Sequence, residues 1–171
     1  MRLHRLSPND THWLPALTSL LQETVDGGAS VGFLAPLAAD QALAYWQGVL
    51  ADLDDLLQLW IAEDDGQLLG SVQLSRCGKA NGSHRGEVQK LMVASTARGR
   101  GIARQLMEAV EAGASAAGID LLVLDTRKGS AAETAYTRLG WTRAGEIPGF
   151  ALQPHGGLAA TVLFYKRLEA A

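Results

Sequence analysis

The stretch Val93-Ala-Ser-Thr-Ala-Arg98-Gly99-Arg100-Gly101-Ile102-Ala103 decides the fold expected for this chain. An apolar strand at 88–93 leads into it, and an amphipathic helix at 102–117 follows it. The first N–H groups of a helix have no partner within the helix, and the helix dipole favours an anion there. The two glycines let the backbone approach a ligand closely, and the two arginines can add charge-assisted hydrogen bonds. The stretch therefore predicts a phosphate-binding turn, with a basic helix start that binds no ligand as the alternative.

Two well-known phosphate motifs do not fit this turn. A dinucleotide-binding turn has the pattern G-x-G-x-x-G, and Arg104 stands where its third glycine belongs. A P-loop ends in G-K-[ST], and no such lysine follows Gly101. The spacing Arg98-x-x-Gly101-x-Ala103 instead resembles the acyl-CoA pyrophosphate loop of the GNAT superfamily of N-acyltransferases.

Composition and charge narrow the class of protein. The chain has 171 residues, of which 47% are hydrophobic and 19% charged, and this predicts one globular domain over residues 1–171. A net charge of −3 argues against a nucleic-acid partner. The single cysteine, Cys77, is expected to be an inert thiol in a reducing cytoplasm. There is no apolar leader, no membrane-spanning stretch and no histidine spacing typical of a metal site, so neither a membrane nor a metal is expected.

Hydrophobic periodicity predicts the element order β-α-α-β-β-β-α-β-α-β-β. Strands are expected at 2–6, 57–62, 68–74, 87–93, 121–124, 141–147 and 159–166. Helices are expected from the Ser7–Asp10 cluster to about Val25 and at 38–53, 102–117 and 131–139. The order indicates an α/β (α+β) domain with a mixed, mostly antiparallel sheet of about seven strands and helices on both faces. It resembles the GNAT fold over the whole chain, which implies a V-shaped splay between strands 87–93 and 121–125.

A narrower resemblance lies within this superfamily. The chain is similar to the tabtoxin resistance acetyltransferases, which acetylate a toxic β-lactam amino-acid analogue with acetyl-CoA. The segments that carry this resemblance are Glu23–Phe33, Glu87–Val93, Ala97–Gly101 and Leu124–Thr126. The first one discriminates, because in GNAT enzymes the loop between the first two helices helps to form the acceptor site. It implies that the acceptor contacts Ser30, Val31 and Phe33; Phe150 and His155 are further loop candidates, with scaffold or solvent roles as alternatives.

The superfamily resemblance also implies acetyl-CoA as the cosubstrate and assigns residues to it. The pyrophosphate is expected on Arg98, Gly99, Arg100, Gly101, Ile102 and Ala103. The pantetheine arm is expected along the main chain of Leu91, Met92 and Val93, where an N–H polarises the thioester carbonyl. Many family members carry an asparagine where this chain has Gly129, and Ser130 is expected to replace it.

Three side chains are candidates for catalysis. An amine must lose its proton before it attacks a thioester, which at pH 7 costs about 4–5 kcal/mol for a lysine-like amine and about 1 kcal/mol for an α-amine. The resemblance implies that Glu87, at the start of one central strand, and Asp125, at the end of the other, take part in this activation. The alternatives are a surface charge for Glu87 and a helix-start cap for Asp125. Tyr136, in the segment 132–141, resembles the GNAT tyrosine that protonates the leaving thiolate, with a core tyrosine as the alternative.

These patterns together predict a cytoplasmic acetyl-CoA-dependent N-acetyltransferase. Acetyl would pass directly to the amine of a small amino-acid-like acceptor, with toxin or antibiotic detoxification as one role. Acetylation of a protein N-terminus or lysine is a second hypothesis, and a non-catalytic acyl-CoA-binding module is a third. The family resemblance also suggests a homodimer.

Overall fold

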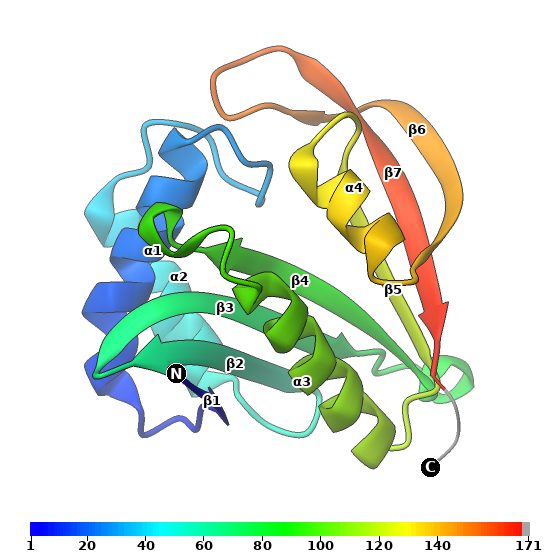
Figure 1. Cartoon of the computed structure of the whole chain (residues 1–171), viewed down its shortest axis with the longest axis horizontal. Helices are drawn as coiled ribbons and strands as arrows, with labels where there is room; N and C mark the ends of the chain where they lie inside the picture. Colours follow the sequence, from blue (N-terminus) through cyan, green and yellow to red (C-terminus); the bar gives the residue numbers. More distant parts are fainter. Residues whose placement is uncertain (169–171) are drawn as a thin grey trace.

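A computed structural model describes residues 1–168, which form one seven-stranded sheet in the order β1-β2-β3-β4-β5-β7-β6 (Figure 1). The last three residues of the expected domain lie outside the described residues. Neighbouring strands are antiparallel except for the parallel pair β4–β5. The strands are β1 (Arg2–Arg5), β2 (Leu57–Asp64), β3 (Gln67–Arg76), β4 (Arg85–Val93), β5 (Leu121–Arg127), β6 (Thr142–Leu152) and β7 (Leu158–Arg167).

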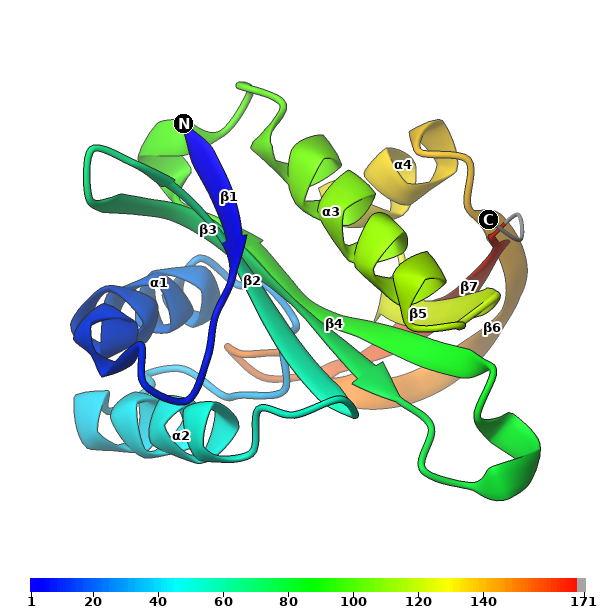
Figure 2. The same ribbon diagram turned by 90° about the horizontal axis from the view of Figure 1, so that it is seen from below.

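Helices cover both faces of this sheet. Figure 2 shows α1 (Leu14–Asp26) and α2 (Ala39–Ala51) on one face, and α3 (Ile102–Ala116) and α4 (Ala131–Arg138) on the other. Each face has its own apolar core: Trp46 and Leu21 belong to the cluster under α1 and α2, and Leu106 and Phe164 to the cluster under α3 and α4. No helix within residues 1–168 is long and apolar enough to cross a membrane. The predicted fold class and element order are confirmed.

Some element boundaries differ from the prediction. The Ser7–Asp10 cluster forms a turn in which the Asp10 carboxylate accepts hydrogen bonds from the N–H and hydroxyl of Ser7. A short 3₁₀ turn follows, and α1 begins only at Leu14, because Pro15 has no N–H and suits a first helical turn. Strand β6 continues through a Pro148–Gly149 irregularity to Leu152, so Phe150 lies in a strand rather than in a loop.

The two central strands separate soon after they meet. The β4–β5 pairing covers only Arg85–Glu87 opposite Leu121–Val123. Beyond that point β4 continues along β3, and β5 continues along β7. The V-shaped splay implied by the family resemblance is therefore confirmed.

A bulge bends β4 where the splay opens. Lys90 has φ +51°, and the β3–β4 register shifts between Ser71 and Gln73. Two β4 residues, Lys90 and Leu91, therefore stand opposite Val72 alone. A bulge of this kind leaves one residue outside the ladder and bends its strand.

Close packing between β3 and β4 holds the splayed strand in place. A Cβ added at Gly70 would lie 2.6 Å from the Met92 carbonyl oxygen and 3.1 Å from Leu106 Cδ1. The glycine therefore lets β4 lie directly against β3 under the start of α3.

We expect Gly70→Ala to lower the free energy of unfolding by about 1–3 kcal/mol, because the backbone of β4 would have to shift. Gly48→Ala is the matched control, because Gly48 is exposed in α2 and an added Cβ meets nothing within 4 Å. It should raise the free energy of unfolding by about 0.5–1 kcal/mol through helix propensity. Urea unfolding at equilibrium measures both changes, and a Gly70→Ala variant as stable as the parent would contradict the packing described.

Candidate active site

The predicted phosphate turn connects β4 to α3. A single 3₁₀ turn, Ser95–Ala97, is followed by Gly99 and Gly101, which both have φ +75°. Gly101 is the N-cap of α3, and no side chain caps the helix. The first main-chain hydrogen bond of α3 runs from Gln105 N–H to the Gly101 carbonyl at 3.2 Å. The amides of Ile102 and Ala103 lie before this bond and therefore have no partner within the helix. Amides at the start of a helix are the type of group that binds an anion.

The two arginines of the turn are exposed and weakly engaged. Arg98 Nε donates to the Val93 carbonyl at 3.4 Å, and Arg100 lies 3.8 Å from the Asp64 carboxylate. An exposed ion pair of this length contributes little to stability. Both guanidinium groups can therefore exchange these contacts for a phosphate.

The splay exposes one edge of β4 to a ligand. Ala94 N–H donates to the Leu69 carbonyl at 2.9 Å, and Met92 stands opposite Ser71 in the same ladder. Because the N–H groups of an antiparallel strand alternate in direction, those of Leu91 and Val93 point away from β3. The structure thus brings Leu91 and Val93 to the open edge, whereas the Met92 side chain is buried under α1 and α2.

The two candidate carboxylates lie on the same face of the sheet. Val88 and Leu124 are buried in the cluster under α3 and α4, so alternation directs Glu87 and Asp125 to the opposite face. Glu87 pairs with Val123. Asp125 therefore lies two residues further along the splay, as the simple register predicted.

A threonine of β7 orients Asp125. The hydroxyl of Thr161 donates to Asp125 Oδ2 at 2.6 Å, and Thr161 is buried. Asp125 lies inside β5, and the side chain that caps α4 is that of Ser130. The alternative that Asp125 caps the start of the helix is therefore wrong.

Ser130 has local partners. Its hydroxyl accepts from Glu133 N–H at 3.3 Å and lies 3.3 Å from the Thr126 hydroxyl. The Glu133 carboxylate in turn accepts from Gly129 N–H at 2.7 Å. This capping arrangement fixes the start of α4 and places Tyr136 on the helix face that packs on the sheet.

Tyr136 lies on the other side of the sheet from the two carboxylates. It is buried against Trp141 and Phe164, with ring centroids 6.1 and 6.0 Å away. Burial, and secondarily the charge of Asp125, raises the pKa of Tyr136 to about 12. The phenol therefore remains a hydrogen-bond donor throughout the physiological pH range.

The loop between α1 and α2 reaches the carboxylate face of the sheet. Phe33 packs edge-on against Tyr45 at 5.2 Å, Val31 joins the core under α1 and α2, and Ser30 is exposed. Two contacts join this part of the chain to the β6–β7 turn (Figure 1). Ala35 N–H donates to the Pro154 carbonyl at 2.9 Å, and His155 Nε2 lies 3.0 Å from the Asp26 carbonyl oxygen.

Sequence reasoning missed several residues of this face. Lys90 lies over the rings of Tyr45 and Phe33, and the Tyr45 hydroxyl donates to Gln73 Oε1 at 3.1 Å. Thr161, which orients Asp125, was also missed. The sequence signal for Lys90 was a lysine in a central strand directly before the apolar residues Leu91, Met92 and Val93, and the other residues carried no local signal.

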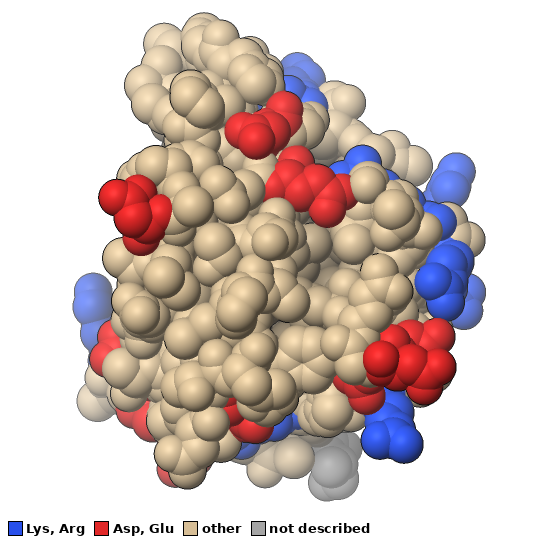
Figure 3. All heavy atoms as spheres, turned by 90° about the vertical axis from the view of Figure 1, so that its left-hand side faces the viewer, with Lys and Arg blue, Asp and Glu red and all other residues tan. Residues whose placement is uncertain are grey.

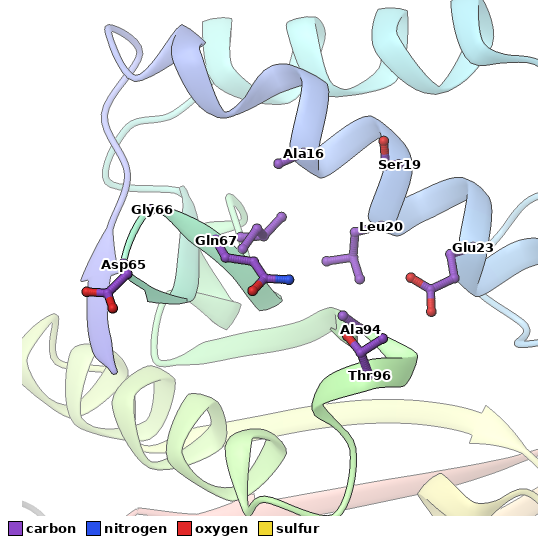
Figure 4. Close-up of a pocket in the computed structure, with 10 residues that line it drawn as sticks. Ala16, Ser19, Leu20, Glu23, Asp65, Gly66, Gln67, Ala94 and Thr96 are labelled. Carbon is purple, nitrogen blue, oxygen red and sulfur yellow. The ribbon is translucent and has the colours of Figure 1, made fainter.

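Glu23 connects α1 to the phosphate turn. Its carboxylate accepts from Ser95 N–H at 2.7 Å, and interaction first with the Ser95 hydroxyl and then with this N–H holds the pKa of Glu23 below its usual value. Figure 4 shows Glu23 beside a surface hollow of about 520 Å³ between α1, the β2–β3 turn and Thr96. None of the predicted site residues lines this hollow, so it is separate from the splay.

Charge is distributed unevenly over the molecule. From Leu6 to Ser75, which includes α1, α2 and β2, the sequence has no lysine or arginine. Figure 3 shows one side of the molecule as largely uncharged, with lysine and arginine mainly towards its edges. The phosphate turn and the first turn of α3 carry Arg98, Arg100 and Arg104.

Comparisons with known proteins identify the family and the fold. Residues 55–143 match the acetyltransferase (GNAT) domain family. An uncharacterized N-acetyltransferase from the hisH-hisA intergenic region of Azospirillum brasilense is 33% identical over 129 residues, which cover 74% of each chain.

Solved structures share the fold at lower identity. The ribosomal-protein-alanine N-acetyltransferase of Brucella melitensis superposes with a TM-score of 0.80 at 21% identity, covering 98% of this chain and all of that one. The protein yncA of Salmonella typhimurium, solved with its cofactor acetyl-CoA, superposes with a TM-score of 0.78 at 16% identity, covering 99% of this chain and 95% of that one. By its match to the family over residues 55–143 and its identity to the Azospirillum protein, this chain belongs to the GNAT family of N-acetyltransferases.

Proposed function

We propose that this chain, acting as one domain over residues 1–171, transfers acetyl directly from acetyl-CoA to the amine of a small amino-acid-like acceptor. One observation supports the proposal: Glu87 and Asp125, on the two strands that separate at the splay, lie on one face of the sheet, and the buried Tyr136 lies on the other. The resemblance of Glu23–Phe33 to tabtoxin resistance acetyltransferases supports an acceptor of the β-lactam amino-acid kind.

The residues around the splay fit acetyl-CoA. The amides of Ile102 and Ala103, with Arg98 and Arg100 beside them, would hold the diphosphate. The open edge at Leu91 and Val93 would bind the pantetheine arm as an added strand, and one of its N–H groups would polarise the thioester carbonyl. Bound there, the cosubstrate supplies an activated acetyl group and a thiolate leaving group.

The side chains of this chain would act on both sides of the reacting carbon. Asp125, oriented by Thr161, or Glu87 through water, would take the proton of the acceptor ammonium. The amine nitrogen then bonds to the acetyl carbon, and the bond from that carbon to sulfur breaks. The thiolate takes up a proton, so at neutral pH the reaction yields the amide, the thiol and one proton.

The pKa of Tyr136 limits what this residue can do. Full proton transfer from a phenol with a pKa of about 12 to a thiolate whose conjugate thiol has a pKa near 8.5 is uphill by about 5 kcal/mol. Tyr136 is therefore better suited to stabilise the departing thiolate by donating a hydrogen bond.

The contacts between the α1–α2 loop and the β6–β7 turn support a small acceptor. The contacts of Ala35 with Pro154 and of His155 with Asp26 join two segments across one end of the carboxylate face. Such a bridge would obstruct an extended polypeptide lying along this face. Protein N-termini and lysines are the alternative acceptors, and a non-catalytic acyl-CoA-binding module is the remaining alternative.

The proposal is tested by measuring thiol release from acetyl-CoA across a panel of acceptors. We expect turnover with amino acids or β-lactam amino-acid analogues, sequential kinetics, and little turnover with peptides, polyamines or aminoglycosides. Ping-pong kinetics would contradict direct transfer. Turnover confined to peptides would favour the protein acceptor, and coenzyme A binding by calorimetry without turnover on any amine would favour the binding module.

We expect Asp125→Asn to lower kcat about 10- to 100-fold and to leave the KM for acetyl-CoA within about twofold. The deficit should shrink as the pH rises towards the pKa of the acceptor's ammonium, because a growing fraction of the amine is then already neutral. Thr161→Val, which retains the carboxylate but removes its hydrogen-bond donor, should have a smaller effect. Asp120→Asn, an exposed change just before β5, is the matched control, and an unaltered kcat in Asp125→Asn would remove the proposed role.

We expect Tyr136→Phe to lower kcat about 10- to 100-fold with little change in the KM for the acceptor. Because burial keeps the pKa of Tyr136 at about 12, its ionisation does not limit activity below about pH 11. Any loss of activity between about pH 9 and 11 should therefore have the same midpoint in the variant and the parent. A midpoint present only in the parent would assign that loss to Tyr136 and contradict the effect of burial.

A further inference from the structure

Lys90 is placed on the acceptor face by the bulge in β4. Strict alternation along the strand would put Lys90 on the same face as Val88, towards α3. The extra residue at the bulge instead leaves Glu87, Lys90 and Met92 on the face of α1 and α2. The left-handed backbone of Lys90, with φ +51°, is uncommon for a residue with a long side chain and is held there by the pairing of β4 with β3.

The Lys90 ammonium lies over two aromatic rings. Its Nζ is 5.5 Å from the centroid of Tyr45 and 6.0 Å from that of Phe33, at cation–π distance. A Cβ added at Gly32 would lie 3.6 Å from the same Nζ. The expected acceptor loop therefore passes close to the ammonium.

The charges around Lys90 leave its ammonium without a close counter-ion. Burial lowers the pKa of Lys90, and the carboxylates of Glu87 and Asp125 act in the opposite direction. Both carboxylates thus act electrostatically on Lys90. However, no ion pair within 4.0 Å among residues 1–168 includes Lys90. A half-buried charge without a close counter-ion is unfavourable until an anion binds to it.

We propose that Lys90 binds the carboxylate of the acceptor while Glu87 and Asp125 face its amine, so that the site selects zwitterionic amino acids over simple amines. This inference rests on the proposed function and assigns its specificity to one residue. Lys90 lies on the side of the acceptor loop, and the carboxylates flank the splay. An acceptor held in this way directs its amine towards the splay and its carboxylate away from it.

The same arrangement favours product release. Acetylation converts the ammonium into a neutral amide, and the product retains only its carboxylate. It therefore loses its attraction to Glu87 and Asp125, while their repulsion of the carboxylate remains. The purely structural alternative is that Lys90 packs on Tyr45 and Phe33 and does not bind the acceptor.

The test compares L-alanine, L-serine and L-lysine, each with its carboxamide, and expresses kcat/KM per neutral amine because the carboxamide lowers the pKa of the adjacent ammonium. In the parent enzyme we expect kcat/KM to favour at least one acid over its amide by about 10- to 100-fold, the usual effect of one charge-assisted hydrogen bond. Lys90→Met should abolish this preference and leave kcat/KM for the amide within about threefold of the parent. Lys90→Arg should restore part of the preference, and Lys79→Met, an exposed lysine in the β3–β4 connection, should have no effect.

A binding measurement separates this inference from the proposed function. Calorimetry on the enzyme with coenzyme A present compares the same six compounds with the parent and with Lys90→Met. If no compound is acetylated but an acid binds more tightly than its amide only when Lys90 is present, the proposed function fails and the carboxylate site stands. The inference is overturned if none of the acids binds more tightly than its amide, or if Lys90→Met weakens acid and amide equally.

Discussion

The absence of hydrogen bonds between β4 and β5 beyond Glu87 and Val123 is the feature on which the site depends. Sheets rarely leave interior strands unpaired, because every backbone N–H and C=O group there needs a partner. Here β4 remains paired with β3, and β5 remains paired with β7. The sheet therefore stays intact, while the facing edges of β4 and β5 are open in its middle. An extended ligand that pairs like a strand satisfies such edges. The splay is therefore a gap in the fold that offers a candidate binding surface.

Two local departures from regular structure convert this gap into a chemical site. The bulge at Lys90 bends β4 and brings a cation to the face that Glu87 already occupies. The capped start of α4 fixes Tyr136 against the opposite face. Both devices act through backbone geometry, so the side chains are positioned by elements rather than by loops. Such positioning holds the groups around the splay in fixed relation before any ligand binds.

The sequence predicted the fold better than the site. Apolar periodicity and the turn at 98–103 identified the strands, helices and splay, because these depend on local patterns and one family resemblance. The bulge at Lys90 could not be predicted, because strict alternation assigns Lys90 to the opposite face. The hydrogen bond from Thr161 to Asp125 joins residues 36 positions apart in strands whose register only the fold determines. Ser130 was expected near the cofactor, and its capping of α4 was not predicted, although Ser130-x-x-Glu133 has the pattern of a capping box.

The distribution of charge matches the two substrates that the site would bring together. Coenzyme A carries several phosphates, and the arginines lie at and just after the turn where its diphosphate would bind. The segment from Leu6 to Ser75 has acidic residues but no lysine or arginine, so the side built from α1 and α2 attracts an ammonium. In that setting a single half-buried lysine is a strong local exception, because nothing else in α1, α2 or β2 would attract a carboxylate. The negative charge of this side thus favours the ammonium of the acceptor, and Lys90 would favour those amines that also carry a carboxylate.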